Sequence, residues 1–367
     1  GKGALQWDHP MAVGAIGVTG SSAANAVARE ADLVFAVGTR LQDFTTGSHA
    51  LFPQARLLSL NVQAFDAHKW HGEALVCDAR VGLRALSQGV GAWSADDGWT
   101  GAARRAAAAW NARVTELTTA ALPRGVLPYE ADVIGAVRDS APDSAGGDIV
   151  VCAAGTLPAE LHKLWRSAAP GNYHVEYGYS CMGYEIAGGL GVKLARPGRE
   201  VIVMVGDGSY LMMSQEIVTA VQEGVKLIVV LVQNHGFASI GALSESLGSQ
   251  RFGTRYRYRT QTGLDGDVLP VDLAANAASL GARVASVSGI AELEKAFAEA
   301  QAADVTTVIH VETDPFVPAP DSPAWWDVPV AEVASLESTR DARATYEEQK
   351  SRQRSHLRPA TNERDHR

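Results

Sequence analysis

Short, mostly apolar runs rich in β-branched residues recur along the chain and alternate with stretches of helical periodicity. Continuous apolar runs of this length, separated by helical patterns, are typical of parallel strands that helices cover on both faces. The pattern therefore predicts an α/β fold with doubly wound parallel sheets. The runs are Leu33–Val37, Leu57–Leu60, Ile149–Cys152, Val201–Val205, Leu227–Val232 and Thr307–Val311.

The alternation breaks between about residues 89 and 128, where an Ala/Arg-rich helical segment at 101–114 carries no strand. A strand-free segment between two strand–helix series indicates a linker. We therefore expect a partial first α/β domain at 1–95, a linker at 96–124, a second α/β domain at 125–315, and an extension with a solvated tail at 316–367. Since the chain opens on Gly1 with no initiator Met and no opening strand, we also expect it to be a piece of a longer protein.

Composition narrows the classes of function. The chain carries 32 Lys+Arg against 41 Asp+Glu, a formal charge of −9, which disfavours nucleic-acid binding. Its three cysteines form neither a paired framework nor a CxxC motif, which favours a reducing compartment, so we expect the cytoplasm. No apolar run reaches the roughly 18 residues of a membrane span, and no export signal opens the chain, so we expect no membrane partner.

The strongest motif lies at Val201–Gly236, where two apolar runs flank a helical stretch. The first run ends in Gly206–Ser209 (GDGS) and the second in Gln233-Asn234. Because a parallel crossover returns the chain to the same edge of the sheet, Asp207 and Asn234 should converge at adjacent strand ends. One carboxylate and one amide oxygen there can bind a single cation.

The glycines of this motif indicate what else binds. Gly206 and Gly208 let backbone N–H groups approach a ligand closely, and the helix N-terminus expected behind Ser209 favours an anion through its unpaired amides and its dipole. A diphosphate fits such a site. Mg²⁺ is usually held by a few protein oxygens together with phosphate oxygens, so we expect Asp207, Asn234 and the Gly236 carbonyl to hold it. A GDGS tetrapeptide by itself is also a common turn.

A GDG turn followed by an Asn at the end of the next strand resembles the cofactor motif of thiamine-diphosphate (ThDP) dependent enzymes. By that resemblance Asp207, Asn234 and the Gly236 carbonyl hold Mg²⁺ against the diphosphate of the cofactor. The motif departs from the family at one position. The usual Asn-Asn pair reads Gln233-Asn234 here, and the metal role passes only to Asn234.

Two further segments are similar to that family. In Glu176–Ala195, Met182 before Gly183 occupies the position of a bulky apolar residue that supports the bent cofactor, although an ordinary core methionine is the alternative. The resemblance implies that the carbonyl of Ser180 accepts from the aminopyrimidine. It also implies contacts to the diphosphate from residues that follow a strand, where a plain strand-to-helix turn is the alternative: Gly155, Thr156 and Leu157.

The first block resembles the central domain of these enzymes, and the resemblance covers roughly residues 1–340. The strings EYGYSCMGYEI and WWDVPVAEV are most similar to the branch of the family that acts in myo-inositol catabolism. That branch uses ThDP and Mg²⁺ to hydrolyse a carbon–carbon bond of 3D-(3,5/4)-trihydroxycyclohexane-1,2-dione, which gives 5-deoxy-D-glucuronate. We expect this small cyclic dione to be the substrate.

The resemblance also implies what this chain lacks. In the family the Glu that activates the cofactor lies in an N-terminal pyrimidine-binding domain, and the active site forms between subunits of at least a homodimer. This chain contains no such domain, so we expect it to carry the diphosphate half-site and no catalytic residue of its own.

Other functions remain open at this point. One is an acetolactate-synthase-like carboligase that acts on 2-oxo acids, and another is a non-catalytic ThDP-binding fragment or half of a split enzyme. A serine hydrolase built on Ser180 is disfavoured, because GxSxG requires Gly where this chain has Met182. A dinucleotide site at Gly14–Gly20 lacks both the preceding strand and the GxGxxG spacing.

Overall fold

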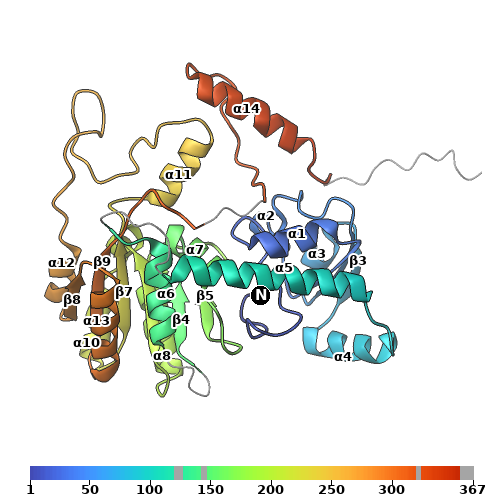
Figure 1. The fold of residues 1–367 in the computed structure, drawn as a ribbon, viewed down its shortest axis with the longest axis horizontal. Coiled ribbons are helices and arrows are strands. Elements are labelled where there is room, and N and C mark those ends of the chain that lie inside the picture. The colour runs from blue at the N-terminus through green and yellow to red at the C-terminus, as the bar shows by residue number, and fades with distance from the viewer. Residues whose placement is uncertain (120–126, 142–146, 320–323, 356–367) are drawn as a thin grey trace, which may run out of the picture.

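Two separate parallel sheets make up the framework of the molecule (Figure 1). The computed structural model describes residues 1–119, 127–141, 147–319 and 324–355. The smaller sheet has the strand order β1-β2-β3, with β1 at Leu33–Val37, β2 at Arg56–Asn61 and β3 at Glu73–Val76. All ladders between named strands are parallel, which confirms the α/β fold class.

The larger sheet has the strand order β5-β4-β6-β7-β9-β8. Its central strands β6 and β7 pair from Ile202 opposite Ile228 to Gly206 opposite Val232, so both strands end at the same level. The strands are β4 (Ile149–Cys152), β5 (Tyr173–Val175), β6 (Val201–Gly206), β7 (Ile228–Gln233), β8 (Arg283–Val287) and β9 (Thr307–Glu312).

Helices cover both faces of the larger sheet. Successive side chains of a strand point to opposite faces, and here the apolar side chains on both faces are buried. Even-numbered residues of β6, such as Ile202, pack against α6 (Glu130–Ser140), α7 (Thr156–Leu164) and α13 (Ile290–Ala302). Odd-numbered residues such as Val203 belong to a second buried cluster that contains residues of four further helices. Those helices are α8 (Tyr184–Ala195), α9 (Asp207–Met212), α10 (Glu216–Gln222) and α12 (Leu273–Ser279).

The six predicted strands are all present, with ends that differ by one residue at most. Strands β3, β5 and β8 lie at sheet edges, where a strand needs no continuous apolar run, and the apolar pattern does not predict them. The helical stretch after GDGS is two helices, α9 (Asp207–Met212) and α10, separated at 213–215.

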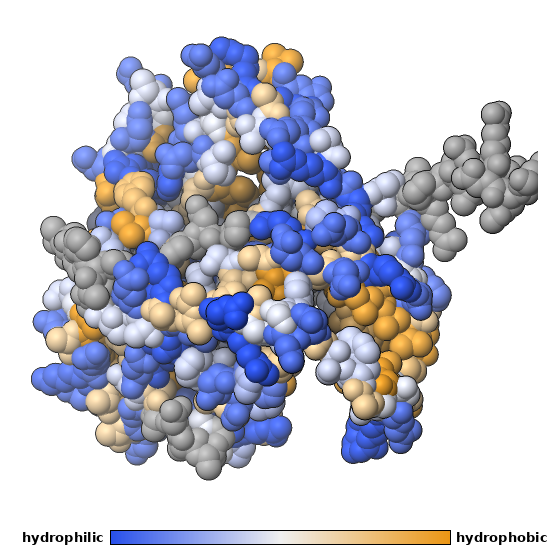
Figure 2. All heavy atoms as spheres, turned by 45° about the vertical axis from the view of Figure 1, so that its right-hand side comes forward, coloured by the Kyte–Doolittle hydropathy of each residue, from blue (hydrophilic) through white to orange (hydrophobic). Residues whose placement is uncertain are grey.

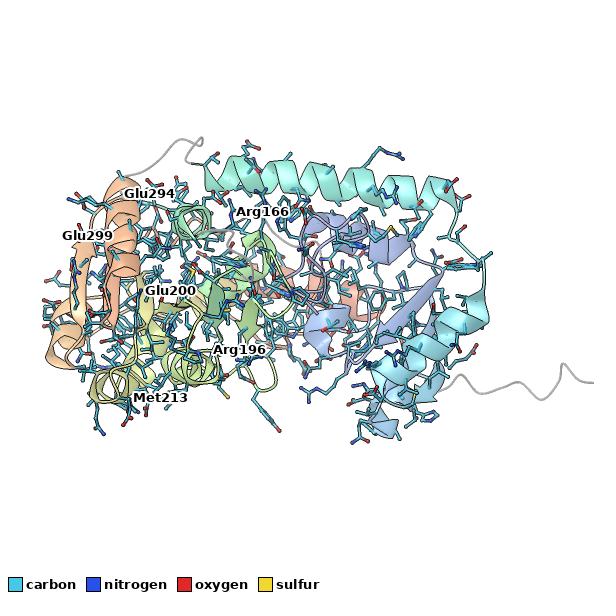
Figure 3. All side chains as sticks on the ribbon, turned by 90° about the horizontal axis from the view of Figure 1, so that it is seen from below. Arg166, Arg196, Glu200, Met213, Glu294 and Glu299 are labelled. Atoms are coloured by element: carbon cyan, nitrogen blue, oxygen red, sulfur yellow. The ribbon has the colours of Figure 1, made fainter. Side chains whose placement is uncertain are left out.

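A long helix, α5 (Asp97–Thr118), runs alongside both sheets (Figure 1). It packs against α1 (Ser22–Glu30) of the first part and against α6 of the second. Arg166 reaches toward it (Figure 3) and donates to the Asn111 carbonyl at 2.8 Å and to the Thr115 hydroxyl at 2.7 Å. The residues expected to form a linker therefore include a helix anchored to both parts.

The smaller sheet leaves apolar side chains exposed. Figure 2 shows an apolar area on the side of the molecule to which this sheet belongs. The helices here are α2 (Asp43–Thr46), α3 (Ala64–His68) and α4 (Ala79–Val90). The exposed apolar residues of the sheet and of α3 and α4 include Leu33, Val37, Phe65, Leu75, Val76, Val81 and Leu83.

The C-terminal extension contacts both parts of the molecule. The Trp326 ring meets Phe44 edge-on at 4.6 Å between centroids, and the Asp327 N–H donates to the Ser48 hydroxyl. Beyond it, α14 (Glu337–Lys350) begins close to the segment that follows α11 (Ala238–Ser246). The contact is a hydrogen bond from the Thr339 hydroxyl to the Gly248 carbonyl. The expected boundary at 124/125 and residues 356–367 of the tail lie outside the described residues. Within the described ranges no helix is long and apolar enough to cross a membrane.

Candidate functional site

The ends of β6 and β7 are joined directly through the side chain of Asp207. This residue opens α9 and is 1% exposed. Its Oδ1 accepts from the Gly208 N–H at 2.8 Å, and its Oδ2 accepts from the Gly236 N–H at 3.1 Å. The structure thus brings together the two turns that the strand-crossover argument expects to converge.

Asn234 follows β7 and is also buried. Its Nδ2 donates to Oε1 of Glu130 at 3.1 Å, while its Oδ1 has no hydrogen-bond partner among the described residues. A buried amide oxygen without a partner costs free energy unless a ligand satisfies it. This oxygen fits the donor set of a divalent cation, which prefers carboxylate and amide oxygens.

The turn after Asn234 is held by a second segment. Gly236 has a φ of 153° and forms an isolated antiparallel bridge with Arg255. A Cβ at Gly236 would lie 2.3 Å from the Thr254 carbonyl oxygen, so only glycine fits there. The Phe237 N–H also donates to that carbonyl, at 2.8 Å. The backbone of the candidate metal turn is therefore fixed on both sides.

Met182 and Phe237 cover the GDG turn. The position that a Cβ on Gly208 would occupy lies 3.2 Å from Met182 Cε and 2.9 Å from Phe237 Cε1. Met182 is half-buried and belongs to none of the buried apolar clusters. The structure thus brings Met182 to the turn that carries Asp207. That Met182 supports the cofactor stays a prediction.

The other candidate contacts differ in what they can offer a ligand. Gly155 has a φ of 108° and caps the start of α7 at Thr156. Leu157 is buried in the core, so only its backbone is available. Ser180 is exposed, in a loop held by Glu176, which accepts from two backbone N–H groups there.

Glu185 on α8 lies close to these candidate segments, and no pattern in the sequence predicts it. It is 1% exposed, and its Oε2 accepts from the Gly183 N–H at 3.0 Å. Its Oε1 and the buried Ser209 hydroxyl have no hydrogen-bond partner among the described residues, and burial raises the pKa of Glu185. The hydrogen bond from the Gly183 N–H therefore ties α8 to the backbone of the Met182 segment.

Carboxyl groups gather at this edge of the sheet. Burial raises the pKa of Asp207 to about 6, although the N–H groups of Gly236 and Gly208 oppose the shift. Burial first, and then the neighbouring Glu160, raise the pKa of Glu130 to about 8. A bound cation would offset the cost of keeping such groups ionised and buried.

The protein side chains alone do not complete a metal site in the described residues, since no group of three or more His, Cys, Asp or Glu is arranged to hold an ion. A cation here would need Asn234, backbone oxygens or oxygens of a bound ligand. That requirement agrees with a Mg²⁺ shared with a diphosphate.

Gln233, where the ThDP-enzyme motif has Asn, has its side chain engaged elsewhere. Its Oε1 lies 2.7 Å from His310 Nε2, and its Nε2 lies 3.0 Å from His235 Nδ1. The Nε2 of His235 in turn lies 3.2 Å from Glu312. With both ends of its amide hydrogen-bonded, Gln233 is not available as a ligand in this arrangement.

Comparisons with known proteins agree with this framework. Residues 153–311 match the family model described as the C-terminal TPP binding domain of thiamine pyrophosphate enzymes, and residues 1–86 match the central domain of these enzymes. The chain is 23% identical to a solved ThDP-dependent 4-hydroxybenzoylformate decarboxylase from Rhodococcus jostii RHA1, with a TM-score of 0.55 over 71% of this chain and 44% of that one. This likeness concerns the fold alone.

Curated relatives are more similar in sequence. A 3D-(3,5/4)-trihydroxycyclohexane-1,2-dione hydrolase from Geobacillus thermodenitrificans is 39% identical over 93% of this chain and 56% of its own length. A protein of the same name from Clostridium perfringens is 37% identical over 93% of this chain and 57% of its own length. This chain thus spans a little over half the length of these relatives. It belongs to the thiamine pyrophosphate enzyme family, of which it carries sequence of the central domain and of the C-terminal TPP-binding domain.

Proposed function

We propose that the protein hydrolyses a carbon–carbon bond of 3D-(3,5/4)-trihydroxycyclohexane-1,2-dione to give 5-deoxy-D-glucuronate, with ThDP and Mg²⁺. One observation carries the proposal: Asp207 and the unpartnered Oδ1 of Asn234 lie at the ends of two neighbouring strands. They do so in a chain similar over 93% of its length to relatives named for this hydrolysis.

In this proposal the cation is held by Asp207, Asn234 and the Gly236 carbonyl. The diphosphate lies against the GDGS turn, with Gly206, Gly208 and Ser209, and against the turn of Gly155, Thr156 and the Leu157 backbone. Met182 supports the thiazolium ring, and the Ser180 carbonyl accepts from the aminopyrimidine. The packing of Met182 over Gly208 and the hydrogen bond from the Gly183 N–H to the buried Glu185 support this arrangement.

When bound, the cofactor would supply a nucleophilic carbon for a ketone of the substrate and an electron sink for cleavage of the ring bond. The residues of this chain bind and orient it. Asp207 is held in one orientation by two N–H groups, so little reorganisation accompanies cation binding. Met182 and Phe237 present apolar surface at the GDG turn and keep water away from the reacting atoms. No side-chain nucleophile is required.

The remainder of the active site comes from outside this chain in our proposal. Relatives are nearly twice as long, and we assign the activating Glu to a pyrimidine-binding domain in the part this chain does not span. The site then forms between subunits of at least a homodimer. We retain the division at 1–95, 96–124, 125–315 and 316–367, which the two separate sheets support, and a cytoplasmic location, which the free state of Cys77, Cys152 and Cys181 supports.

The test uses the protein translated from its full reading frame. With ThDP and Mg²⁺ it should release acid from the cyclic dione, and it should form no acetolactate from pyruvate. Removal of Mg²⁺ with a chelator should stop the reaction, and added Mg²⁺ should restore it. Acetolactate formation without hydrolysis of the dione would replace this proposal with the carboligase alternative.

A further inference from the structure

We propose that Glu130 is a positioning residue for the metal site, which holds the Asn234 amide with its oxygen toward the cation. The inference rests on the proposed function, because it concerns the same candidate site. It adds a residue far from the motif: Glu130 lies 104 positions before Asn234 and on another element, the first turn of α6.

The hydrogen bond between the two side chains defines the orientation of the amide. Oε1 of Glu130 accepts from Nδ2 of Asn234 at 3.1 Å, and both residues are buried. A bound cation would favour the ionised form of Glu130, and an ionised carboxylate is an acceptor only, so it pairs with the NH₂ end of the amide and not with the carbonyl end. The amide oxygen must then point away from Glu130, and it is the atom without a partner.

The backbone on either side of Asn234 is already fixed. Residues up to Gln233 pair with β9, and the Gly236 N–H donates to Asp207. The remaining freedom lies in the side-chain rotation of Asn234. Without Glu130 the amide could turn its NH₂ toward the cation, which an amide nitrogen does not ligate. The contact with Glu130 removes that alternative.

Glu130 is itself held in place by packing. It begins α6, in which every residue from Glu130 to Arg138 is buried, and α6 packs against α5, α7 and α13. The helix therefore carries the carboxyl group to the end of β7 as part of a rigid element. This is the arrangement expected of a group that orients a metal ligand.

A purely structural role in the start of α6 is the competing explanation, and Asp132 offers a matched control. It lies in the same first turn and is equally buried, and its Oδ2 accepts from the Tyr129 N–H at 2.9 Å. Loss of that contact should weaken the start of α6 without changing the partner of the Asn234 amide.

The experiment measures Mn²⁺ binding by electron paramagnetic resonance in the presence of ThDP, together with thermal melting, on the protein from its full reading frame. Glu130→Leu should weaken Mn²⁺ binding about 10- to 100-fold, the range typical of lost partners of metal ligands. Glu130→Gln should bind Mn²⁺ like the unmutated protein, because its amide oxygen can accept from the same NH₂. Asp132→Ala should lower the melting temperature and leave Mn²⁺ affinity unchanged.

Several outcomes would overturn the inference. Unchanged affinity in a folded Glu130→Leu protein is one, and an equal loss in Asp132→Ala is another. If Glu130→Leu does not fold, Glu130→Ala takes its place, and failure of Glu130→Gln to retain affinity in a folded protein decides against the proposal. If the unmutated protein binds no Mn²⁺ with ThDP, the metal part of the proposed function fails too. If Asp207→Ala loses Mn²⁺ binding while Glu130→Leu keeps it, the inference about Glu130 fails and the proposed metal site stands.

Discussion

Asp207 is the residue on which the candidate site depends most. Its two carboxylate oxygens accept from backbone N–H groups of two different turns, those of Gly208 and Gly236. The carboxylate therefore has a structural role and a candidate ligand role at once. Its pKa, raised by burial to about 6, reflects the cost of keeping a charge in this position.

We predict that Asp207→Ala abolishes Mg²⁺-dependent binding of ThDP, because the cation loses its only predicted carboxylate ligand and the turn at Gly236 loses an acceptor. Calorimetric titration of ThDP with and without Mg²⁺ measures the effect. Asp207→Asn, which keeps the volume, controls for loss of fold. Unchanged ThDP affinity in a folded Asp207→Ala protein would show that the metal lies elsewhere.

Met182 allows a second prediction at this scale. If it supports the bent cofactor, Met182→Ala in the full-length protein should lower turnover much more than stability. A fully buried methionine would instead cost about 2–5 kcal/mol of folding free energy with little change in activity per folded molecule. Thermal melts and activity normalised to folded protein distinguish the two. A loss of activity that merely follows the loss of folded protein would assign Met182 to packing.

Residues of the candidate site differ in how far the sequence predicts them. Asp207 and Asn234 follow from one rule, that parallel crossovers bring strand ends to one edge. Glu130 and Glu185 do not follow from it. Glu130 meets Asn234 only because α6 packs beside β7, and Glu185 is a single acid in an apolar helix. Their partners are set by tertiary packing, which leaves no local pattern in the sequence.

At the scale of elements, α7 connects the two parts of the molecule through a half-buried histidine. His162 Nδ1 lies 3.0 Å from the Thr19 hydroxyl and 3.2 Å from the Thr19 carbonyl, in the segment before α1. Burial, followed by the charge of Lys2, lowers the pKa of His162 from 6.5 to about 3. The neutral ring is therefore part of the contact between α7 and the first part of the chain.

This pKa predicts a pH dependence of stability. Between about pH 6.5 and pH 3 the unfolded chain binds a proton at His162 that the folded chain does not. The stabilisation from neutral His162 is thus fully present above pH 6.5 and falls by about 1.4 kcal/mol per pH unit as the pH decreases. Urea unfolding from pH 7 to pH 4 should give a shallower decline for His162→Asn, which cannot titrate. Parallel curves for the two proteins would contradict the prediction.

The elements themselves were predictable where burial is complete. Strands β6 and β7 are buried along nearly all their length, so their sequences are continuous apolar runs. The edge strand β8 mixes exposed and half-buried residues, and β5 has only three residues. Such strands exist because a neighbour offers hydrogen-bonding groups, and that neighbour cannot be recognised from the local sequence.

At the scale of the whole molecule, the described residues form two sheets, and the chain spans 56% of the length of a relative. We predict that this 367-residue chain, purified alone and saturated with ThDP and Mg²⁺, hydrolyses no cyclic dione. In our proposal the activating Glu and part of the cavity wall lie outside these residues, so general acid–base assistance worth about 10²–10⁴-fold would be absent. A product assay measures this, with the remaining portion added in trans as control. Robust turnover by the chain alone would place the activating group within these residues.

The position of β6 and β7 at the centre of the larger sheet has a consequence for motion. Each has a strand on both sides and helices on both faces, so their amide hydrogens should exchange with solvent only when the whole domain opens. The candidate ligands Asp207 and Asn234 begin one residue beyond these strands. The candidate site therefore lies at the boundary of the most protected part of the domain, and a ligand that binds there need not open the sheet beneath it.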